Sequence, residues 1–121
     1  MRLVHDGTPI PQGRAKASRW GFYYPKTSKA HRQELVDAWT SQYRGEPLDG
    51  ELEIAIFVVG PRVSSDPDNH AKMILDSLVD AGVITSDDCR VVAKLTVERQ
   101  LHVPKSQRYT AVEIQPWRRG L

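Results

Sequence analysis

Residues 52–82 read LEIAIFVVGPRVSSDPDNHAKMILDSLVDAG, and this stretch decides the fold. Residues 52–59 are apolar on both faces of an extended chain, which predicts a central strand that is largely covered. A glycine and a proline end this strand. Asp66 then favours a helix start as an N-cap, Pro67 suits the first helical position, and Ala81-Gly82 favours the helix end. The apolar residues between them follow helical spacing, at Ala71, Ile74, Leu75 and Leu78.

The segments on either side complete an α+β pattern. Thr27 or Ser28 favours the start of another helix, which is expected to run to about Tyr43. Further strands are expected at Arg2–His5, Trp20–Tyr24, Val91–Arg99 and Tyr109–Gln115. We therefore expect one domain over residues 1–121, with a mixed, mainly antiparallel sheet packed with two helices.

Residues 91–99 alternate between apolar and polar side chains. The alternation predicts that Val91, Ala93, Leu95 and Val97 point inward, and that Lys94, Thr96 and Glu98 point outward. Residues 101–108 are expected to join this strand and the last one as a hairpin.

The formal net charge of +2 hides an uneven distribution. Residues 1–32 carry a charge of +6, residues 33–90 carry −8, and residues 91–121 carry +4. Clusters of basic residues near the two ends of the chain are suited to binding a polyanion, and a cluster of acidic residues is suited to binding a metal ion. The charge distribution alone fits a solvated surface equally well. No apolar run approaches the length of a membrane span, and a single cysteine permits no internal disulfide. A cytoplasmic protein without a membrane partner is the expectation.

Acidic residues gather where the helix after the central strand begins. Asp66 and Asp68 are two residues apart, and Asp68, Lys72 and Asp76 share one helix face at a spacing of four. Each of these residues alone also fits a structural role. Asp66 suits a helix cap, Asp68 suits the helix dipole, and Lys72 suits ion pairs on a solvated face.

A third carboxylate, Asp88 or its neighbour Asp87, follows this helix after a short turn. Clustered carboxylates repel one another unless a cation joins them, and oxygen ligands suit Mg²⁺. Metal-assisted hydrolysis of a phosphodiester needs such a site. Lys72 is placed to stabilise charge that develops on the phosphate.

Two other metal sites do not fit the sequence. A calcium loop that starts at Asp66 has Ala71 where glycine is needed and Ser77 where the bidentate glutamate belongs. A zinc site lacks paired ligand spacing among Cys89 and the four histidines. His70 is expected to be a surface or supporting residue rather than a metal ligand, and Cys89 is expected to be a small buried residue.

Several motifs together resemble one family. They are Pro9-Ile10-Pro11-Gln12-Gly13-Arg14, Tyr24-Pro25-Lys26, Asp66-Pro67-Asp68-Asn69-His70-Ala71-Lys72, Leu75-Asp76-Ser77-Leu78, Ala81-Gly82-Val83-Ile84 and Asp87-Asp88. From roughly Pro9 to Val92 the chain is similar to the RusA-type crossover junction endodeoxyribonucleases, known as Holliday junction resolvases. The central pattern, D-x-D-N-x-x-K-x-x-x-D-x-L followed by an Asp-Asp pair, is the specific part of this resemblance.

The resemblance implies a homodimeric, Mg²⁺-dependent enzyme that cuts four-way DNA junctions by paired symmetric incisions, in recombination and repair. It implies Asp66, Asp68 and Asp88 as catalytic metal ligands, and Lys72 as a further catalytic residue. Mn²⁺ is expected to substitute for Mg²⁺. A bacterial or phage-encoded cytoplasmic protein is implied as well. Residues of secondary interest are Asn69, Asp76 and Asp87, the last as an alternative third ligand.

Basic side chains are candidates for contacts with DNA phosphates. They are Arg14, Lys16, Arg19, Lys26, Lys29 and Arg62. Two other functions remain open at this point. One is a nuclease of the same chemistry that selects flaps or replication forks, and the other is a DNA-binding module without catalysis.

Overall fold

The computed structural model describes residues 1–10, 16–18, 21–23, 26–61 and 67–118 of the 121-residue chain. Of residues 16–18, 21–23, 26–27 and 67–68 it describes the backbone alone. The strands are β1 (Arg2–Asp6), β2 (Lys16–Ser18), β3 (Gly21–Tyr23), β4 (Leu52–Val59), β5 (Val92–Gln100) and β6 (Tyr109–Pro116). The helices are α1 (Lys26–Gln42), α2 (Pro67–Asp80) and a 3-10 turn, η1 (Lys105–Gln107). The predicted α+β class with two α-helices is confirmed.

The main sheet has the strand order β1-β6-β4-β5. β6 runs antiparallel to β1 and to β4, whereas β4 and β5 are parallel. The sheet is therefore mixed and mostly antiparallel, and β4 is the predicted central strand. The predicted hairpin between β5 and β6 is wrong, because β4 lies between these two strands. Parallel neighbours need a crossover connection, and α2 supplies it between β4 and β5.

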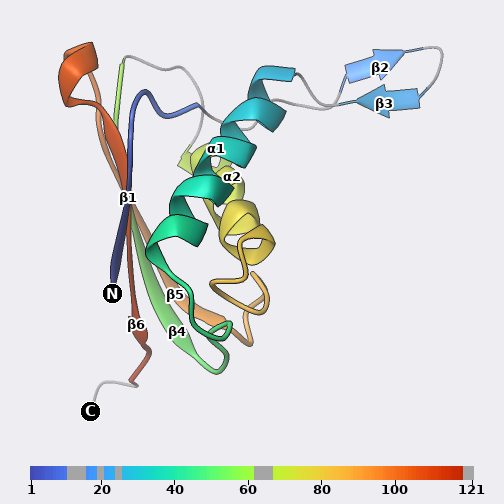
Figure 1. Ribbon diagram of the computed structural model, residues 1–121, viewed down its shortest axis with the longest axis vertical. Helices are drawn as coiled ribbons and strands as arrows, with labels where there is room; N and C mark the ends of the chain where they lie inside the picture. The colour runs from blue at the N-terminus through green and yellow to red at the C-terminus, as the bar shows by residue number, and fades with distance from the viewer. Residues whose placement is uncertain (11–15, 19–20, 24–25, 62–66, 119–121) are drawn as a thin grey trace.

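Both helices lie on one face of the main sheet (Figure 1). Along β4, Leu52, Ile54, Ile56 and Val58 are each at most 4 % exposed, whereas the intervening residues 53, 55 and 57 are half-buried. The expectation that β4 is covered on both faces is therefore correct for the helix side and only partly correct for the other. A single layer of helices explains this difference.

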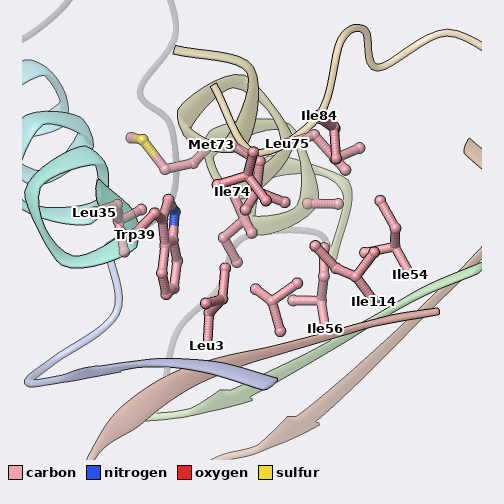
Figure 2. Close-up of a cluster of buried hydrophobic side chains, with 14 of the residues drawn as sticks. Leu3, Leu35, Trp39, Ile54, Ile56, Met73, Ile74, Leu75, Ile84 and Ile114 are labelled. Carbon is pink, nitrogen blue, oxygen red and sulfur yellow. The ribbon is translucent and has the colours of Figure 1, made fainter. Parts of the chain in front are cut away.

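The core fills the space between the helices and the sheet (Figure 2). Trp39 of α1 lies above Leu3 of β1, and both are at most 1 % exposed. The indole Nε1 of Trp39 donates to the Ser77 hydroxyl of α2 at 2.8 Å. A buried indole N–H needs such a partner, so this bond fixes α1 against α2 at the centre of the core.

β5 is an edge strand, and its exposure differs from the prediction. Leu95 and Val97 pair in register with Ile54 and Ile56, so they face the helix side as predicted. Leu95 is nevertheless 40 % exposed, and Ala93 is exposed as well. The alternation gave the correct face for Leu95 and Val97, and Val91 is buried as predicted. The predicted burial is wrong for Ala93 and Leu95, because an edge strand has a neighbouring strand on one side only.

The predicted ends of α2 are confirmed within the described residues. The helix begins at Pro67, and Gly82 follows its end with a φ of +72°. The Gly82 N–H donates to the Val79 carbonyl at 3.0 Å, and the Val83 N–H donates to the Leu78 carbonyl at 2.9 Å. Glycine adopts this left-handed conformation without steric cost, so the helix ends here and the chain turns.

The predicted strand at Trp20–Tyr24 is present as β3, over Gly21–Tyr23. β2 was not predicted, and it forms a short antiparallel hairpin with β3 in which Ala17 pairs with Phe22. Figure 1 draws this hairpin beyond the first turn of α1, away from the main sheet. Trp20 and Tyr24 lie outside the described residues.

Two single-residue expectations had different outcomes. Cys89 is exposed in the turn before β5, so the expectation of a buried cysteine is wrong. His70 is 2 % exposed, so the expectation of a surface position is wrong and the supporting role stays a prediction. Neither helix in the described ranges has the length and apolar character that a membrane crossing requires.

Candidate active site

The predicted acidic segment leaves the sheet where the parallel strands β4 and β5 both end. The Gly60 N–H donates to the Gln100 carbonyl at 2.9 Å, and the Val103 N–H donates to the Gly60 carbonyl at 3.1 Å. These bonds hold the end of β4 against the end of β5. The chain then enters residues 62–66, outside the described residues, and α2 begins at Pro67.

The structure describes some of the predicted site residues in full, some by their backbone alone and some not at all. Asp66, Arg14, Arg19 and Arg62 lie outside the described residues, and only the backbones of Asp68, Lys16 and Lys26 are described. Asp68 falls in the first turn of α2. One turn later Lys72 is exposed, and Asn69 between them is half-buried. Lys29 is exposed in the first turns of α1.

Asp88 is held in a tight turn immediately before β5. Its Oδ1 accepts the Arg90 N–H at 2.9 Å, and its Oδ2 accepts the Arg90 Nη2 at 2.8 Å. Its own N–H donates to the Ser86 hydroxyl at 3.2 Å. The hydrogen bonds from the Arg90 side chain and backbone lower the pKa of Asp88 to about 2. The carboxylate is therefore ionised at neutral pH, and any cation that binds it competes with Arg90.

Asp87 and Asp76 lie within electrostatic range of each other. Burial raises the pKa of Asp76, and the charges of Arg32 and Lys72 oppose this rise. The neighbouring charge of Asp87 adds to the rise. Lys72 and Asp87 thus both lie within electrostatic range of Asp76, while Asp88 is engaged by Arg90. Asp87 and Asp88 therefore both stay candidates for the third metal ligand.

Asp76 also has a structural partner that the sequence did not indicate. Arg32 of α1 lies 2.6 Å from Asp80 Oδ2 through its Nε, and 3.7 Å from Asp76 Oδ2 through its Nη1. The ion pairs join α1 to α2 across 44 and 48 residues of sequence, which no local pattern reveals. Arg90 was also missed, although an arginine two residues after an aspartate in a turn is a local signal.

Residues 8–10, which precede the basic N-terminal residues, contact the chain at Gly60, where β4 has just ended. A Cβ atom placed on Gly60 would lie 3.2 Å from Cδ of Pro9, so these two residues are in close contact. The Arg108 Nη1 donates to the Thr8 hydroxyl at 3.3 Å, and the Ile10 N–H donates to His31 Nε2 at 3.3 Å. Residues 8–10 therefore lead into the basic segment from a point beside the end of β4.

The donor set of the predicted site fits a hard divalent cation. Asp66, Asp68 and Asp88 supply carboxylate oxygens only, which is the ligand chemistry that Mg²⁺ prefers. Within the described ranges, no group of three or more histidine, cysteine or acidic side chains is arranged to hold a metal ion. The side chains of Asp66 and Asp68 are outside that search, so the predicted ligand set stays a prediction.

Comparison with protein families identifies the class of this protein. Residues 6–115 match the family described as endodeoxyribonuclease RusA, so the chain belongs to the RusA endodeoxyribonuclease family. The match spans both helices and the main sheet from the end of β1 nearly to the end of β6. The protein is thus a hydrolase of the class that cuts DNA internally. A comparison with curated proteins gives no match.

Proposed function

We propose that this protein is a Mg²⁺-dependent, structure-selective endodeoxyribonuclease that resolves four-way DNA junctions by paired symmetric incisions. The observation that carries the proposal is the family match together with the placement of its central motif. Asp68 and Lys72 lie in the first two turns of α2, and Asp88 lies in the turn shortly before β5. The proposed setting is DNA recombination and repair in the cytoplasm of a bacterium or a phage-infected cell.

In this proposal, Asp66, Asp68 and Asp88 hold the cation. Bound there, a divalent ion supplies Lewis-acid stabilisation to a phosphodiester. Lys72 is exposed one turn after Asp68, which suits a side chain that contacts a non-bridging phosphate oxygen and stabilises its developing charge. Asn69 and Asp76 lie on the same helix and are proposed to have secondary roles beside these groups.

The proposed DNA contacts come from the basic N-terminal third and the loop after β4. Arg14, Lys16, Arg19, Lys26, Lys29 and Arg62 supply the positive charge. The contact of Pro9 with Gly60 supports this assignment, because it joins a residue shortly before the basic segment to the residue that follows β4. Positive charge from two parts of the chain suits a branched substrate, on which duplex arms leave in several directions.

The deciding experiment is a Mg²⁺ titration with a synthetic four-way junction, a flap, a fork and a linear duplex. The resolvase proposal expects paired cuts in opposite strands of the junction and little cutting of the others. Preferred cutting of the flap or fork would replace the resolvase by a nuclease of another substrate class. Binding of the junction without any cutting, in Mg²⁺ or Mn²⁺, would leave a DNA-binding module.

Asp68→Asn tests the metal site itself. The variant should lose at least about a hundredfold in cleavage, because a neutral amide is a weak ligand for a hard cation. Junction binding in EDTA should be retained or strengthened, since a negative charge near phosphate is removed. Mn²⁺ affinity, measured by electron paramagnetic resonance without DNA, should fall. The matched control is Asp37→Asn, which changes an exposed acid of α1 bonded to Gln33. Near wild-type cleavage by Asp68→Asn would remove Asp68 from the site.

A further inference from the structure

Histidines from three different elements have buried ring nitrogens that lack a hydrogen-bond partner within the described residues. They are Nδ1 of His5 in β1, Nδ1 of His31 in α1 and Nε2 of His70 in α2. The rings of His5 and His31 lie edge to face, with their centroids 5.6 Å apart. Most buried polar atoms have a partner, so an unpartnered pair of histidines at this place in the fold calls for a physical explanation.

His31 holds the chain shortly before the basic N-terminal residues. Its side chain is 3 % exposed, and its Nε2 accepts the Ile10 N–H at 3.3 Å. Ile10 is four residues before Arg14 and six residues before Lys16, two of the proposed DNA contacts. The two residues before Ile10 are held beside the end of β4 and the start of β6. The bond to His31 adds an attachment to α1, closer to the basic residues.

The bond to Ile10 determines where His31 carries its proton. A ring nitrogen that accepts an N–H needs its lone pair, so the single proton of the neutral ring is assigned to Nδ1. Nδ1 lies 3.6 Å from Glu34 Oε2, and His5 Nε2 lies 3.8 Å from the same oxygen. A second proton on His31 has to enter at Nε2, which turns the acceptor for Ile10 into a donor. The bond to Ile10 therefore requires a neutral ring.

We propose that His31 is a positioning residue for DNA binding, and that its neutral ring holds Ile10 so that Arg14 and Lys16 start from a fixed point beside α1. Four residues of extended chain span at most about 14 Å, so an attached Ile10 limits where Arg14 can lie. Without the attachment, more of this segment has to be ordered when DNA binds, which lowers the affinity. The DNA part of this inference rests on the proposed function. The attachment itself does not.

The groups around His31 favour the neutral ring. Burial is the main cause that lowers the pKa of His31, and the neighbouring His5 lowers it further, whereas Glu34 raises it. From α2, His70 is a further titratable group within electrostatic range of His31, and Arg99 of β5 acts on His70. His31 therefore gains its second proton only below pH 6.5. Acid should then weaken DNA binding through this residue, although added positive charge ordinarily strengthens binding to a polyanion.

Two neutral amide variants test the attachment. The side chain of His31→Gln is long enough to present an acceptor where Nε2 lies, whereas that of His31→Asn is one methylene shorter and leaves the Ile10 N–H without one. In hydrogen exchange by NMR at neutral pH without DNA, the Ile10 amide should exchange at least about fivefold faster in His31→Asn and nearly as in the wild type in His31→Gln. The Val4 amide, which donates to Gln42 Oε1 at 2.9 Å, is the internal control and should not change. Unchanged Ile10 exchange in His31→Asn, or equal acceleration in both variants, would overturn the attachment.

The wild-type protein tests the requirement for a neutral ring without any variant. In an NMR titration, the ring signal of His31 and the amide signal of Ile10 should change with the same midpoint, below pH 6.5. His31→Gln should abolish the change at Ile10. An Ile10 amide that does not respond when the ring titrates would overturn this requirement. Unfolding of the whole chain before the ring titrates would do the same.

Junction binding in EDTA, measured by fluorescence anisotropy, tests the role in DNA binding. His31→Asn should raise the dissociation constant by about three- to tenfold, the range expected for one net hydrogen bond, and His31→Gln should restore most of the affinity. When Arg14 and Lys16 are both replaced by Ala, adding His31→Asn should have little further effect, because His31 acts through that segment. A fully additive effect, or equal weakening by the Asn and Gln variants, would overturn the positioning role.

The outcomes separate this inference from the proposed function. Faster Ile10 exchange together with unchanged junction affinity would keep the attachment and overturn its role in DNA binding. Junction binding without cleavage in the Mg²⁺ titration would count against the nuclease proposal alone. A chain that binds no junction at all would count against both the proposed function and the positioning role, whereas the exchange measurement would still decide the attachment.

Discussion

Acid should destabilise this protein through His70, at pH values well above those that protonate most carboxylates. The ring is 2 % exposed in the first turn of α2, and its buried Nε2 has no hydrogen-bond partner within the described residues. Burial, with a smaller contribution from the charges of Arg99 and His31, lowers the pKa of His70 from 6.5 to about 4. Folding therefore keeps this ring neutral.

The sign of the effect follows from proton binding. Between pH 6.5 and about 4 the unfolded chain holds a proton on His70 that the folded protein does not, so the free energy of unfolding falls as the pH falls. For one group with these two pKa values, the loss between pH 7.5 and pH 4 is about 3 kcal/mol. Burial also lowers the pKa of His31, which acts in the same direction.

Urea unfolding from pH 7.5 to 4.0, in EDTA and at one protein concentration, measures this loss. His70→Gln removes the titrating group, so its stability should vary less with pH than that of the wild type by about 3 kcal/mol over this range. The matched control is His102→Asn, an exposed histidine at a φ of +62° that asparagine tolerates. This control should keep the wild-type slope. A His70→Gln variant as acid-sensitive as the wild type would refute the neutral buried ring.

The other two predictions concern the core and the DNA contacts. Trp39→Phe should lower the free energy of unfolding by about 2 to 3 kcal/mol, since it removes part of a fully buried ring and its bond to Ser77. Urea unfolding measures the change in the free energy of unfolding. A loss below about 1 kcal/mol would contradict the inference that the Trp39 indole stabilises the centre of the core. Arg14→Ala with Lys16→Ala should weaken junction binding and reduce the slope of log affinity against log salt by about 0.9 for each lost phosphate contact. An unchanged slope would show that neither side chain touches the DNA backbone.

Local pattern was sufficient for the elements around the candidate site. The apolar run of β4, the Asp-Pro start and glycine end of α2, and the spacing of Asp68 and Lys72 are all properties of a short stretch of chain. Backbone conformation, capping and helical period act over a few residues, so the sequence alone carries this information. The same stretch carries the family motif.

Strand order and exposure were decided only by the tertiary structure. No local sequence pattern indicates that β4 lies between β5 and β6, because strand pairing depends on hydrogen bonds between segments that are distant in sequence. The exposure of Leu95 follows from that order, since an edge strand has no neighbour on one side. The burial of His70 and the pairing of Arg32 with Asp76 likewise need two helices brought together. The sequence by itself determined the elements around the candidate site and the candidate chemistry. Only the assembled sheet decided which edge stays open, because solvent exposure is a property of the neighbours a residue acquires on folding.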